Sequence, residues 1–545
     1  MALKGTSANM MGQEVHAPGA PVTQNDGWTS ALLVCLVVIA TLYGLSIYHG
    51  PTSEIGSHEV RVLETARVMA ATGDWIVPRF AGEARLTKPP LPYWMALASY
   101  ELFGEATIWA ARRTLLLLAA ILLLSTYAMA RRVVDRKGAA IAVLVLASSY
   151  LFLVEYRKLT PDPVLTSCIA AAVASLAWSR AGTKNSGSLL VLGDGCVGLS
   201  LLAKGPIAIP FIVIGVYALS RPGDRWPCRA GWHALLCLFA LAPVAAWALA
   251  VYLREPAAFE VWRSEVLGRL PGQKPTDSGR GPSVYLGATL QFLLPWTPVL
   301  LGALFFRSRA DTRVRVGFLV GLAMLVALSS RKLAYMLPLL PLAAVAVASY
   351  LVAYAPTTLR RRFEGHSTVV AGQILLISVA SLIPVGYAAR SYLELSGLSI
   401  PPAALLLLAL IGLLWAMLAR RSPLVPAALM ALFGMILWTQ VLRPHEPHSL
   451  TRYNMGARIK LLNPEEGQLF QLGEQDARLN FHAARVPTRI ASFEDLPADL
   501  PEKALVIAPE SKLPEMLPRG LAVIGQEVVS EGKDPLVLLS PRPIR

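Results

Sequence analysis

Charged residues are scarce in this sequence: they make up 16% of its 545 residues, whereas hydrophobic residues make up 54%. Soluble proteins usually carry about 25% charged residues, so the composition argues against a soluble enzyme. It also excludes a disordered chain, which combines low hydrophobicity with high charge. A membrane β-barrel would show ten-residue segments of alternating hydrophobicity, whereas this chain has long apolar runs over most of its length. The sequence therefore predicts an all-α, polytopic membrane protein.

Several functional signals are also missing. The five cysteines (Cys35, Cys168, Cys196, Cys228 and Cys237) form no disulfide framework and no CxxC zinc spacing. The outer loops contain no HExxH motif and no paired DxD motif, so neither a metal nor another cofactor is predicted. The net charge of +15 could suggest nucleic acid, but no basic segment is interleaved with aromatic residues. We interpret the excess charge as basic loops that orient membrane helices, and predict no nucleic-acid partner.

Thirteen apolar runs are long enough to cross a membrane, which takes about 20 residues and sometimes fewer. They cover residues 29–49, 109–130, 138–156, 162–180, 188–203, 205–220, 232–253, 284–306, 314–330, 333–354, 368–389, 401–419 and 424–442. The run 89–104 is short and follows two prolines, so we interpret it as an interfacial helix; as a span it would be the fourteenth. The polar residues 1–28 lack the apolar core of a signal peptide, and the first run is therefore predicted to be an uncleaved anchor.

The distribution of basic residues predicts the orientation. With the N-terminus in the cytoplasm, arginine and lysine concentrate in inner loops such as 131–137 and 360–362, in agreement with the positive-inside rule. This predicts a protein of the bacterial cytoplasmic (inner) membrane with a cytoplasmic tail over residues 1–28. The transmembrane catalytic domain is then 29–442, and its first periplasmic loop is 50–108.

The C-terminal part of the chain, residues 443–545, has ordinary polarity. Short runs suited to β-strands occur at 468–472, 504–507, 522–529 and 536–539, with helical segments between them. We therefore predict a small α/β domain here, on the periplasmic surface.

Charged residues also occur at the outer ends of spans, where the orientation rule does not require them. They are Glu155, Arg157, Lys158 and Asp162 in EYRKLTPDP, Lys204 in LAKGP, Arg331 and Lys332 in SSRKLAYMLPLLP, and Lys88 in TKPPLPYW. A charge held beside the bilayer is unfavourable unless it is paired or functional. One lysine alone is best explained as a snorkelling side chain at a helix end. Several cations that converge on one face favour a phosphate-binding site.

The first periplasmic loop contains a candidate helix that starts at Ser57, a favourable N-cap. Its apolar residues fall on one face, namely Val62, Ala66 and Met69, which is typical of an amphipathic helix at a membrane surface. The Gly73-Asp74 pair predicts its end. His58 and Glu59, in the first turn, suit either solvated residues stabilised by the helix dipole or catalytic residues, and their spacing does not distinguish these alternatives.

The region around Lys88 is predicted to be rigid. Lys88 precedes Pro89, and a residue before proline is pushed toward extended geometry, so Lys88 is not expected in a regular helix. A lysine fixed in this way at the membrane surface is well suited to bind a phosphate.

These residues resemble a known family. The first loop carries Glu59-x-Arg61-x-x-Glu64-x-Ala66-Arg67-x-Met69, Gly73-Asp74-Trp75-x-x-Pro78, Gly82 and Lys88-Pro89-Pro90-Leu91-x-Tyr93-Trp94. Further matches are Thr160-Pro161-Asp162, Lys204-Gly205-Pro206, Pro295-Trp296 and Lys332-x-x-Tyr335-x-x-Pro338-x-x-Pro341. The pattern is similar to that of bacterial lipid A aminoarabinose transferases. These belong to the GT-C glycosyltransferases, which include the protein O-mannosyltransferases.

The resemblance implies a GT-C fold and an inverting glycosyltransferase with a periplasmic active site. Its donor would be a sugar on a polyprenyl phosphate of the undecaprenyl type, and its acceptor lipid A or another envelope molecule. The best single interpretation is transfer of 4-amino-4-deoxy-L-arabinose to lipid A. The catalytic candidates are His58, Glu59 and Asp162, and the candidates for binding the donor phosphate or sugar are Lys88, Tyr93, Arg157, Lys158, Lys204, Lys332 and Tyr335.

The chain departs from the family pattern in two places. The family usually has Asp-Glu where this chain has His58-Glu59, and a histidine ahead of proline where this chain has Arg280-Gly281-Pro282. Both changes lie near the expected acceptor side. We therefore expect Glu59, as a carboxylate, or His58, as a base or phosphate donor, to replace the usual aspartate.

Two other functions remain open. A transporter or flippase of lipid-linked sugars would also combine many spans with cations, but such proteins often show two related halves, which we do not find here. A protein O-mannosyltransferase-like enzyme would share the donor chemistry and differ in acceptor. A purely structural membrane scaffold gives no reason for the first-loop motif.

Overall fold

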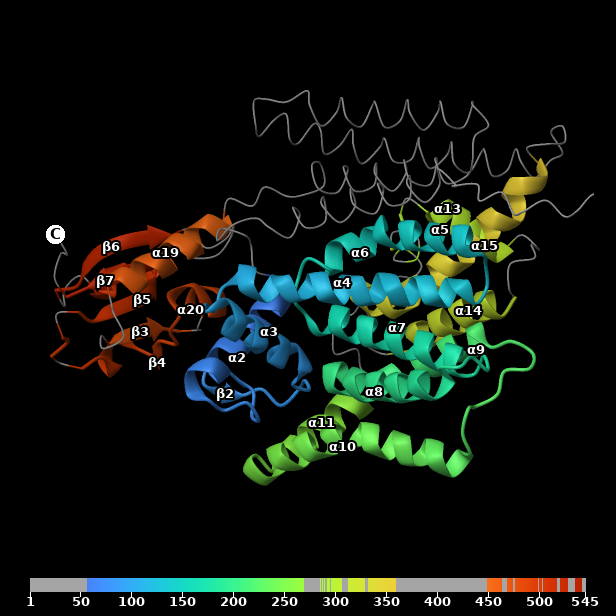
Figure 1. Cartoon of the computed structure of the whole chain (residues 1–545). Coiled ribbons are helices and arrows are strands. Elements are labelled where there is room, and N and C mark those ends of the chain that lie inside the picture. The colour runs from blue at the N-terminus through green and yellow to red at the C-terminus, as the bar shows by residue number, and fades with distance from the viewer. Residues whose placement is uncertain are drawn as a thin grey trace, which may run out of the picture.

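The computed structural model of the chain describes residues 56–268, most of 285–358 and most of 448–541. Four of the expected spans lie outside the described residues: 29–49, 368–389, 401–419 and 424–442. The described part is mostly helical, as the composition predicts. It consists of a bundle of long helices with a smaller α/β unit beyond one end of it (Figure 1).

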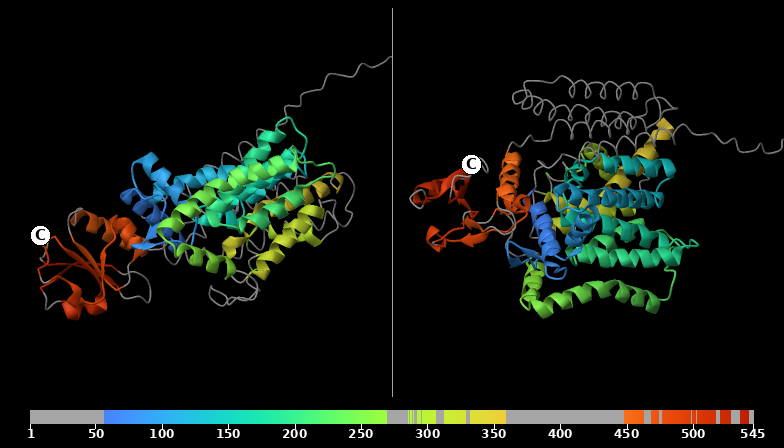
Figure 2. Two further views of the ribbon diagram at one scale, coloured as in Figure 1. Left: turned by 90° about the horizontal axis from the view of Figure 1, so that it is seen from below. Right: turned by 60° about the vertical axis from the view of Figure 1, so that its left-hand side comes forward.

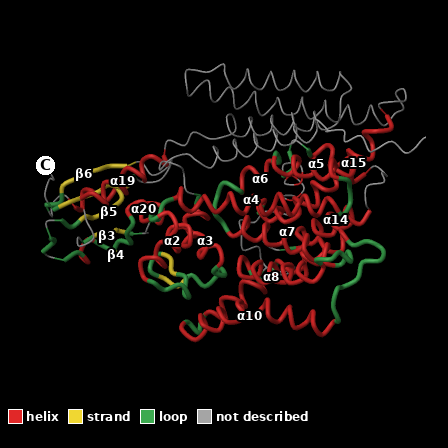
Figure 3. The backbone as a smooth tube through the Cα atoms, viewed as in Figure 1, coloured by secondary structure: helices red, strands yellow, loops and turns green. Residues whose placement is uncertain are grey.

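The bundle is built from apolar helices that lie side by side (Figures 1 and 3). They are α4 (Ile108–Arg131), α5 (Arg136–Ala147), α7 (Pro161–Ser179), α8 (Ser186–Lys204), α9 (Ala208–Leu219), α10 (Ala230–Arg254), α13 (Thr297–Phe305), α14 (Thr312–Ala327) and α15 (Leu340–Thr358). Five described segments are long and apolar enough to cross a membrane: Ile108–Arg131, Pro161–Ser179, Ser186–Lys204, Gly231–Arg254 and Leu333–Ala353. Each coincides with an expected span. A multi-pass membrane protein is thereby supported, and the total of thirteen stays a prediction.

Small residues allow the central helices to pack closely. A Cβ atom added at Gly193 of α8 would lie 2.7 Å from the side chain of Leu176 on α7. A Cβ atom at Gly215 of α9 would lie 2.7 Å from the side chain of Val173, also on α7. Close contact of this kind is typical of helix packing in membranes, where small residues let backbones approach. It brings α7, α8 and α9 together around one shared core.

The expected span 138–156 is interrupted near its end. The chain leaves α5 at Ser148 and continues in the short helix α6 (Tyr150–Glu155). The Ser148 hydroxyl donates to the carbonyl of Leu144 at 2.6 Å and accepts from Trp296 Nε1 at 2.9 Å. Serine side chains that bond back to the preceding turn often bend helices. The break directs Glu155 and the α6–α7 connection toward the end of the bundle that faces the first loop.

The first loop folds into α2 (Ser57–Thr72), a two-stranded ribbon of β1 (Arg79–Phe80) and β2 (Glu83–Ala84), and α3 (Leu91–Phe103). The predicted N-cap is displaced by one residue: Gly56 takes that position and Ser57 is the first helical residue. Helix α2 ends at Gly73 as predicted, in the left-handed conformation (φ 69°) that glycine adopts readily. Its apolar face is buried as predicted, but against α3 and the C-terminal unit rather than in an open interface.

The C-terminal unit is an α/β fold around a five-stranded sheet, which agrees with the predicted class; its periplasmic location stays a prediction. The strands are β3 (Leu469–Leu472), β4 (Thr488–Ile490), β5 (Leu505–Pro509), β6 (Ala522–Glu527) and β7 (Leu536–Ser540), in the order β4-β3-β5-β7-β6. Strand β3 is parallel to β4 and β5, and β7 is antiparallel to β5 and β6. Four of these strands overlap the predicted β-runs.

Each face of this sheet is covered. Helices α19 (His448–Leu462) and α20 (Ala477–Ala483) bury Met455, Ile459 and Leu479 against one face. The other face packs against the short helices η3 (Phe493–Asp495) and α21 (Leu513–Met516) and the residues after η3; η4 (Glu510–Lys512) joins β5 to α21. Helix α20 also contacts α2, where Arg67 Nη1 donates to the carbonyl of Ala484 at 2.8 Å. The first loop therefore lies between the bundle and the C-terminal unit, as two further views show (Figure 2).

Helix α10 runs along the outer edge of the bundle beside α8 and leads into α11 (Ala258–Leu267) (Figure 1). Two tryptophans fix this pair of helices to the first loop. Trp247 Nε1 donates to the carbonyl of Ile76 at 3.0 Å, and Trp262 Nε1 donates to that of Leu86 at 2.8 Å. These bonds hold α11 next to the segment that carries Lys88.

Candidate functional site

A cavity of about 830 Å³ lies where the first loop, α11, the first turn of α7, the last turn of α8 and η1 (Leu333–Leu339) meet. Its lining includes six basic side chains, namely Arg61, Arg85, Lys88, Lys158, Lys204 and Lys332, and four carboxylates, namely Glu59, Glu155, Asp162 and Glu265. A pocket with an excess of basic side chains favours an anionic ligand.

Eight of the ten predicted site residues line this cavity: His58, Glu59, Lys88, Lys158, Asp162, Lys204, Lys332 and Tyr335. Arg157 and Tyr93 are not in its lining. Tyr93 is buried in α3, where its hydroxyl accepts from Arg85 Nε at 3.0 Å. Tyr93 therefore lies behind the cavity wall and supports Arg85, which lines it. Arg331, Pro295 and the Arg280 segment lie outside the described residues.

Asp162, Lys204 and Tyr335 form one connected group. Asp162 is in the first turn of α7, where the helix dipole favours a carboxylate, and it forms an ion pair with Lys204. Lys204 is the last residue of α8, and its Nζ lies 4.2 Å from the centre of the Tyr335 ring, a cation–π contact. The side chain of Lys204 is only 6% exposed. The antiparallel arrangement of α7 and α8 thus places the ammonium group at a fixed point of the cavity wall.

Lys88 occupies the bend between β2 and α3, outside any helix, as predicted from the following proline. Its Nζ lies 3.1 Å from Glu265 Oε1 on α11. Both side chains are partly exposed to the cavity, so a bound anion can reach the ammonium group. Sequence reasoning did not find Glu265, because it lies 177 positions from Lys88 and no motif connects the two.

Glu59 is fully buried and has its carboxylate occupied by protein groups. Arg112 on α4 binds it in a bidentate manner, with Nε to Oε1 at 2.8 Å and Nη2 to Oε2 at 2.7 Å. The backbone N–H of Leu159 donates to the same Oε1 at 3.1 Å. Such paired, charge-assisted bonds are among the strongest in proteins. Glu59 therefore ties α2, α4 and the α6–α7 connection together at the cavity wall, whereas the neighbouring His58 is exposed.

Glu155 ends α6, beyond the break at Ser148 that interrupts the expected span 138–156, and also lines the cavity. Burial raises the pKa of its carboxyl from 4.5 to about 7, although the positive charge of Lys158 opposes this effect. The negative charge of Asp162 raises the pKa further. Glu155 can therefore gain or lose a proton near neutral pH. The sequence marked it as one of several unexplained charges, and no sequence signal indicated its shifted pKa.

An apolar crevice adjoins the cavity. It shares Asp162, Lys204 and Tyr335 with the cavity, and its other lining residues are Leu165, Ile207, Phe211, Leu325, Leu328 and Pro338. The crevice lies between α7, α9, α14 and η1, the segment that ends at Leu339. An apolar surface that begins at a fixed cation suits a ligand with an anionic head and a hydrocarbon chain.

Comparisons with known proteins show which families the chain resembles. A family model described as dolichyl-phosphate-mannose-protein mannosyltransferase matches residues 87–248. A protein of Edwardsiella ictaluri, named undecaprenyl phosphate-alpha-4-amino-4-deoxy-L-arabinose arabinosyl transferase, is 30% identical over 341 residues, which are 59% of this chain and 59% of that protein. A relative in Aquifex aeolicus, described as an uncharacterized protein, is 24% identical over 468 residues, 84% of this chain and 87% of the relative. The chain thus spans less than two thirds of the length of the Edwardsiella protein.

Solved structures agree in fold. The crystal structure of ArnT from Cupriavidus metallidurans bound to undecaprenyl phosphate matches with a TM-score of 0.70 at 18% identity, covering 94% of this chain and 98% of that one. The apo structure of the same protein also gives a TM-score of 0.70. The resemblance inferred from the first-loop motif is therefore confirmed. The chain is therefore similar to the bacterial aminoarabinose transferases over 59% of its length, and it shares the fold of ArnT.

Proposed function

We propose that this protein is an integral-membrane glycosyltransferase that moves a sugar from a polyprenyl-phosphate carrier to an envelope acceptor, with inversion at the anomeric carbon. The observation that carries the proposal is the group of lysines at one end of the bundle, next to an apolar crevice. The best candidate reaction is transfer of 4-amino-4-deoxy-L-arabinose to lipid A, and the active site would face the periplasm of an inner-membrane protein.

The donor side follows from the positions of the cations. The carrier phosphate would bind between Lys204 and Lys88, while its hydrocarbon chain follows the apolar crevice from Lys204. When the bond between the anomeric carbon and the carrier oxygen breaks, its electron pair stays on the carrier phosphate, which gains a negative charge. Cations that are already in place stabilise that charge without reorganisation. ArnT of Cupriavidus metallidurans, which binds undecaprenyl phosphate, supports this class of carrier.

If the acceptor is a phosphate, the acceptor side of the site needs no general base. A phosphate oxygen is already ionised near neutral pH, so it must be positioned and need not be deprotonated. We propose that His58, which is exposed in the cavity, contacts the acceptor, and that Glu59 acts by holding the cavity wall through Arg112. Asp162 would fix Lys204 and orient the sugar.

A protein acceptor is the second candidate. It is favoured by the family model over residues 87–248, whose description is a protein mannosyltransferase. A transporter of lipid-linked sugars is less well supported, because the cavity and its charges lie at one end of the described bundle.

The test is mass spectrometry of envelope lipids and glycoproteins from cells that lack the protein, express it, or express Lys88→Ala. We expect a pentose-sized mass addition on lipid A that requires both the protein and Lys88. The matched control is Lys184→Ala, which removes an exposed lysine in the connection before α8 and should leave the addition intact.

The other outcomes are informative. If lipid A is unchanged and a glycoprotein lacks its sugar in cells without the protein, the acceptor is a protein and the lipid A assignment is refuted. Unchanged glycans together with lipid-linked sugar redistributed across the membrane would overturn the transferase in favour of a transporter. Equal activity of the wild type and Lys88→Ala would contradict the proposed phosphate site.

A further inference from the structure

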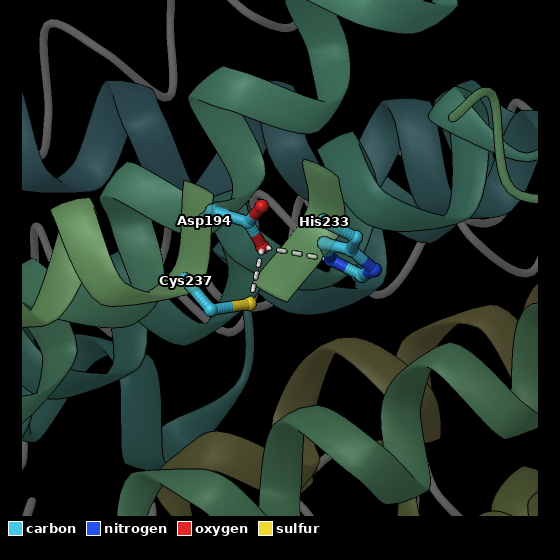
Figure 4. Close-up of side chains that lie close together, drawn as sticks. All are labelled: Asp194, His233 and Cys237. Carbon is cyan, nitrogen blue, oxygen red and sulfur yellow. Dashed lines mark hydrogen bonds and ion pairs between the residues drawn. The ribbon is translucent and has the colours of Figure 1, made fainter. Parts of the chain in front are cut away.

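A second cluster of chemically active side chains lies between α8 and α10, away from the cavity. Asp194 projects from α8 toward His233 and Cys237, which lie one turn apart on α10 (Figure 4). His233 Nε2 is 3.3 Å and Cys237 Sγ 3.9 Å from the same oxygen, Oδ1 of Asp194. One potential ligand atom from each residue lies within 4.8 Å of the other two. Asp194 and Lys204 are ten residues apart on α8, about 15 Å along the helix, so the cluster is separate from the cavity.

Asp194 is difficult to explain as a packing residue. It is 4% exposed in a helix long and apolar enough to cross a membrane. Its Oδ2 atom is buried and has no hydrogen-bond partner within the part of the chain that the structure describes. Acidic residues within transmembrane segments are rare and mark functional sites. The contact with His233 uses only Oδ1, so a simple hydrogen-bonded pair leaves half of the carboxylate unsatisfied.

The three residue types together match the ligands of zinc. Zn²⁺ binds cysteine sulfur, histidine nitrogen and carboxylate oxygen, most often with tetrahedral geometry. A Cys237 thiolate and an Asp194 carboxylate would balance the two positive charges of the ion, and His233 would bind as neutral imidazole. The resulting site is electrically neutral, which matters where the surroundings are apolar. Binding would release the thiol proton of Cys237 to water, and no electron transfer is involved.

The helix packing keeps these ligands close together. A Cβ atom at Gly198 would lie 2.2 Å from the carbonyl oxygen of Ala240, so the backbones of α8 and α10 approach closely at this point. Gly198 lies one turn beyond Asp194 on α8, and Ala240 lies about one turn beyond Cys237 on α10. The ring of His233 packs against that of Trp226, with centroids 4.4 Å apart, which restricts its orientation.

We propose that Asp194, His233 and Cys237 form a structural binding site for a divalent transition metal, preferentially Zn²⁺, that fastens α10 to α8. Water would complete the tetrahedron, since the His233 side chain is partly exposed. Helix α10 is mostly exposed, so a metal clamp here would hold it on the bundle. Through α11, the same helix supplies Glu265 to the cavity wall.

The experiment measures metal bound to the full-length protein, purified in detergent, loaded with Zn²⁺ and passed over a chelating resin. We expect about one zinc per chain in the wild type and roughly tenfold less in Cys237→Ala and in Asp194→Asn. The matched control is Cys168→Ala, which removes a thiol on α7 outside the cluster and should retain the zinc. A wild type without zinc, or variants that bind as much as the wild type, would overturn the proposal.

Cobalt substitution separates loss of the site from misfolding. The wild type and Cys168→Ala loaded with Co²⁺ should show a thiolate-to-cobalt charge-transfer band. Cys237→His should lose this band yet keep bound metal, because imidazole replaces the thiolate as a ligand. Absence of the band from the wild type, or its presence in Cys237→His, would contradict the assignment of Cys237 as a ligand.

Discussion

Glu59 and Arg112 form a buried ion pair whose removal should affect folding before it affects chemistry. The two side chains are 0% and 6% exposed, and both carboxylate oxygens are bonded. Removing one partner of a buried pair leaves the other charge uncompensated, at a typical loss of about 3–5 kcal/mol. We therefore expect Glu59→Gln to lower the thermal unfolding midpoint of the purified protein markedly. His58→Ala, one position away and exposed, should unfold at the wild-type temperature.

A second substitution distinguishes positioning from catalysis at Glu59. In Glu59→Gln/Arg112→Gln, both charges are gone and much of the stability should return. Sugar transfer should return with it if Glu59 acts only through Arg112. A stable double variant without transfer would instead assign Glu59 a direct catalytic role, and this outcome would contradict the positioning role.

The pKa of Glu155 predicts how donor binding depends on pH. Burial raises that pKa to about 7, so the side chain is neutral below this pH and negatively charged above it. A negative charge in the cavity repels the carrier phosphate. We expect the KM for the donor to rise roughly tenfold from pH 6 to pH 8.5 in the wild type, while kcat changes little. In Glu155→Gln, which stays neutral, KM should be low and independent of pH.

The opposite behaviour of Glu155 would identify a different acceptor. If kcat rises through pH 7 and falls by about 100-fold or more in Glu155→Gln, the carboxylate is acting as a general base. A general base is needed for a hydroxyl acceptor and not for a phosphate. Such a profile would refute the lipid A phosphate as acceptor.

At the scale of single elements, the close contact between α8 and α10 has a direct test. A Cβ atom at Gly198 cannot be accommodated without moving the backbone of Ala240. We expect Gly198→Leu to destabilise the protein by about 1–3 kcal/mol, as overpacking commonly does. It should also lower the zinc content, because the ligands on α8 and α10 would move apart. The matched control is Gly195→Leu, since nothing lies within 4 Å of a Cβ atom at Gly195.

Elements could be predicted from the sequence where the signal is local. The apolar runs 109–130 and 162–180 correspond to α4 and α7, because the length of an apolar run is a property of contiguous residues. Strand β4, with only three residues and mostly exposed side chains, gave no such signal. The break in 138–156 was also missed: it lies at Ser148, whose hydroxyl bonds back to Leu144 and also accepts from the distant Trp296.

The candidate site was predictable in its residue types and not in its pairings. Motif spacing and excess charge identified Lys88, Asp162 and Lys204, and the structure places all three at one cavity. The partners Arg112 and Glu265 were not found, because each is far along the chain from the residue it binds. The cluster at Asp194 was not predicted for the same reason. Its ligands come from two helices, and zinc-motif searches depend on spacing within one segment.

At the scale of the whole molecule, α20 couples the C-terminal unit to the first loop. It contacts α2 on one side and α19 on the other, and it carries the half-buried His482. The ring of His482 meets that of Tyr453 edge to face, with centroids 5.5 Å apart. Helices α19 and α20 pack closely here, because a Cβ atom at Gly456 on α19 would lie 2.4 Å from the Cβ of His482. The neutral imidazole therefore fills a closely packed contact between α19 and α20.

Burial lowers the pKa of His482 from 6.5 to about 4, and the positive charge of Arg452 lowers it further, while the negative charge of Asp476 opposes this. Between these pH values the unfolded state binds a proton that the folded state does not, so the stabilisation is complete above pH 6.5 and falls as the pH drops toward 4.

We expect proteolytic cleavage within residues 448–541 of the detergent-purified protein to accelerate over this range. Cleavage in the first loop should accelerate over the same pH range, because α2 packs against α20. His482→Gln should remove much of the acceleration, whereas the exposed His58→Gln should keep it. Equal pH dependence in both variants would place the pH-sensitive group elsewhere.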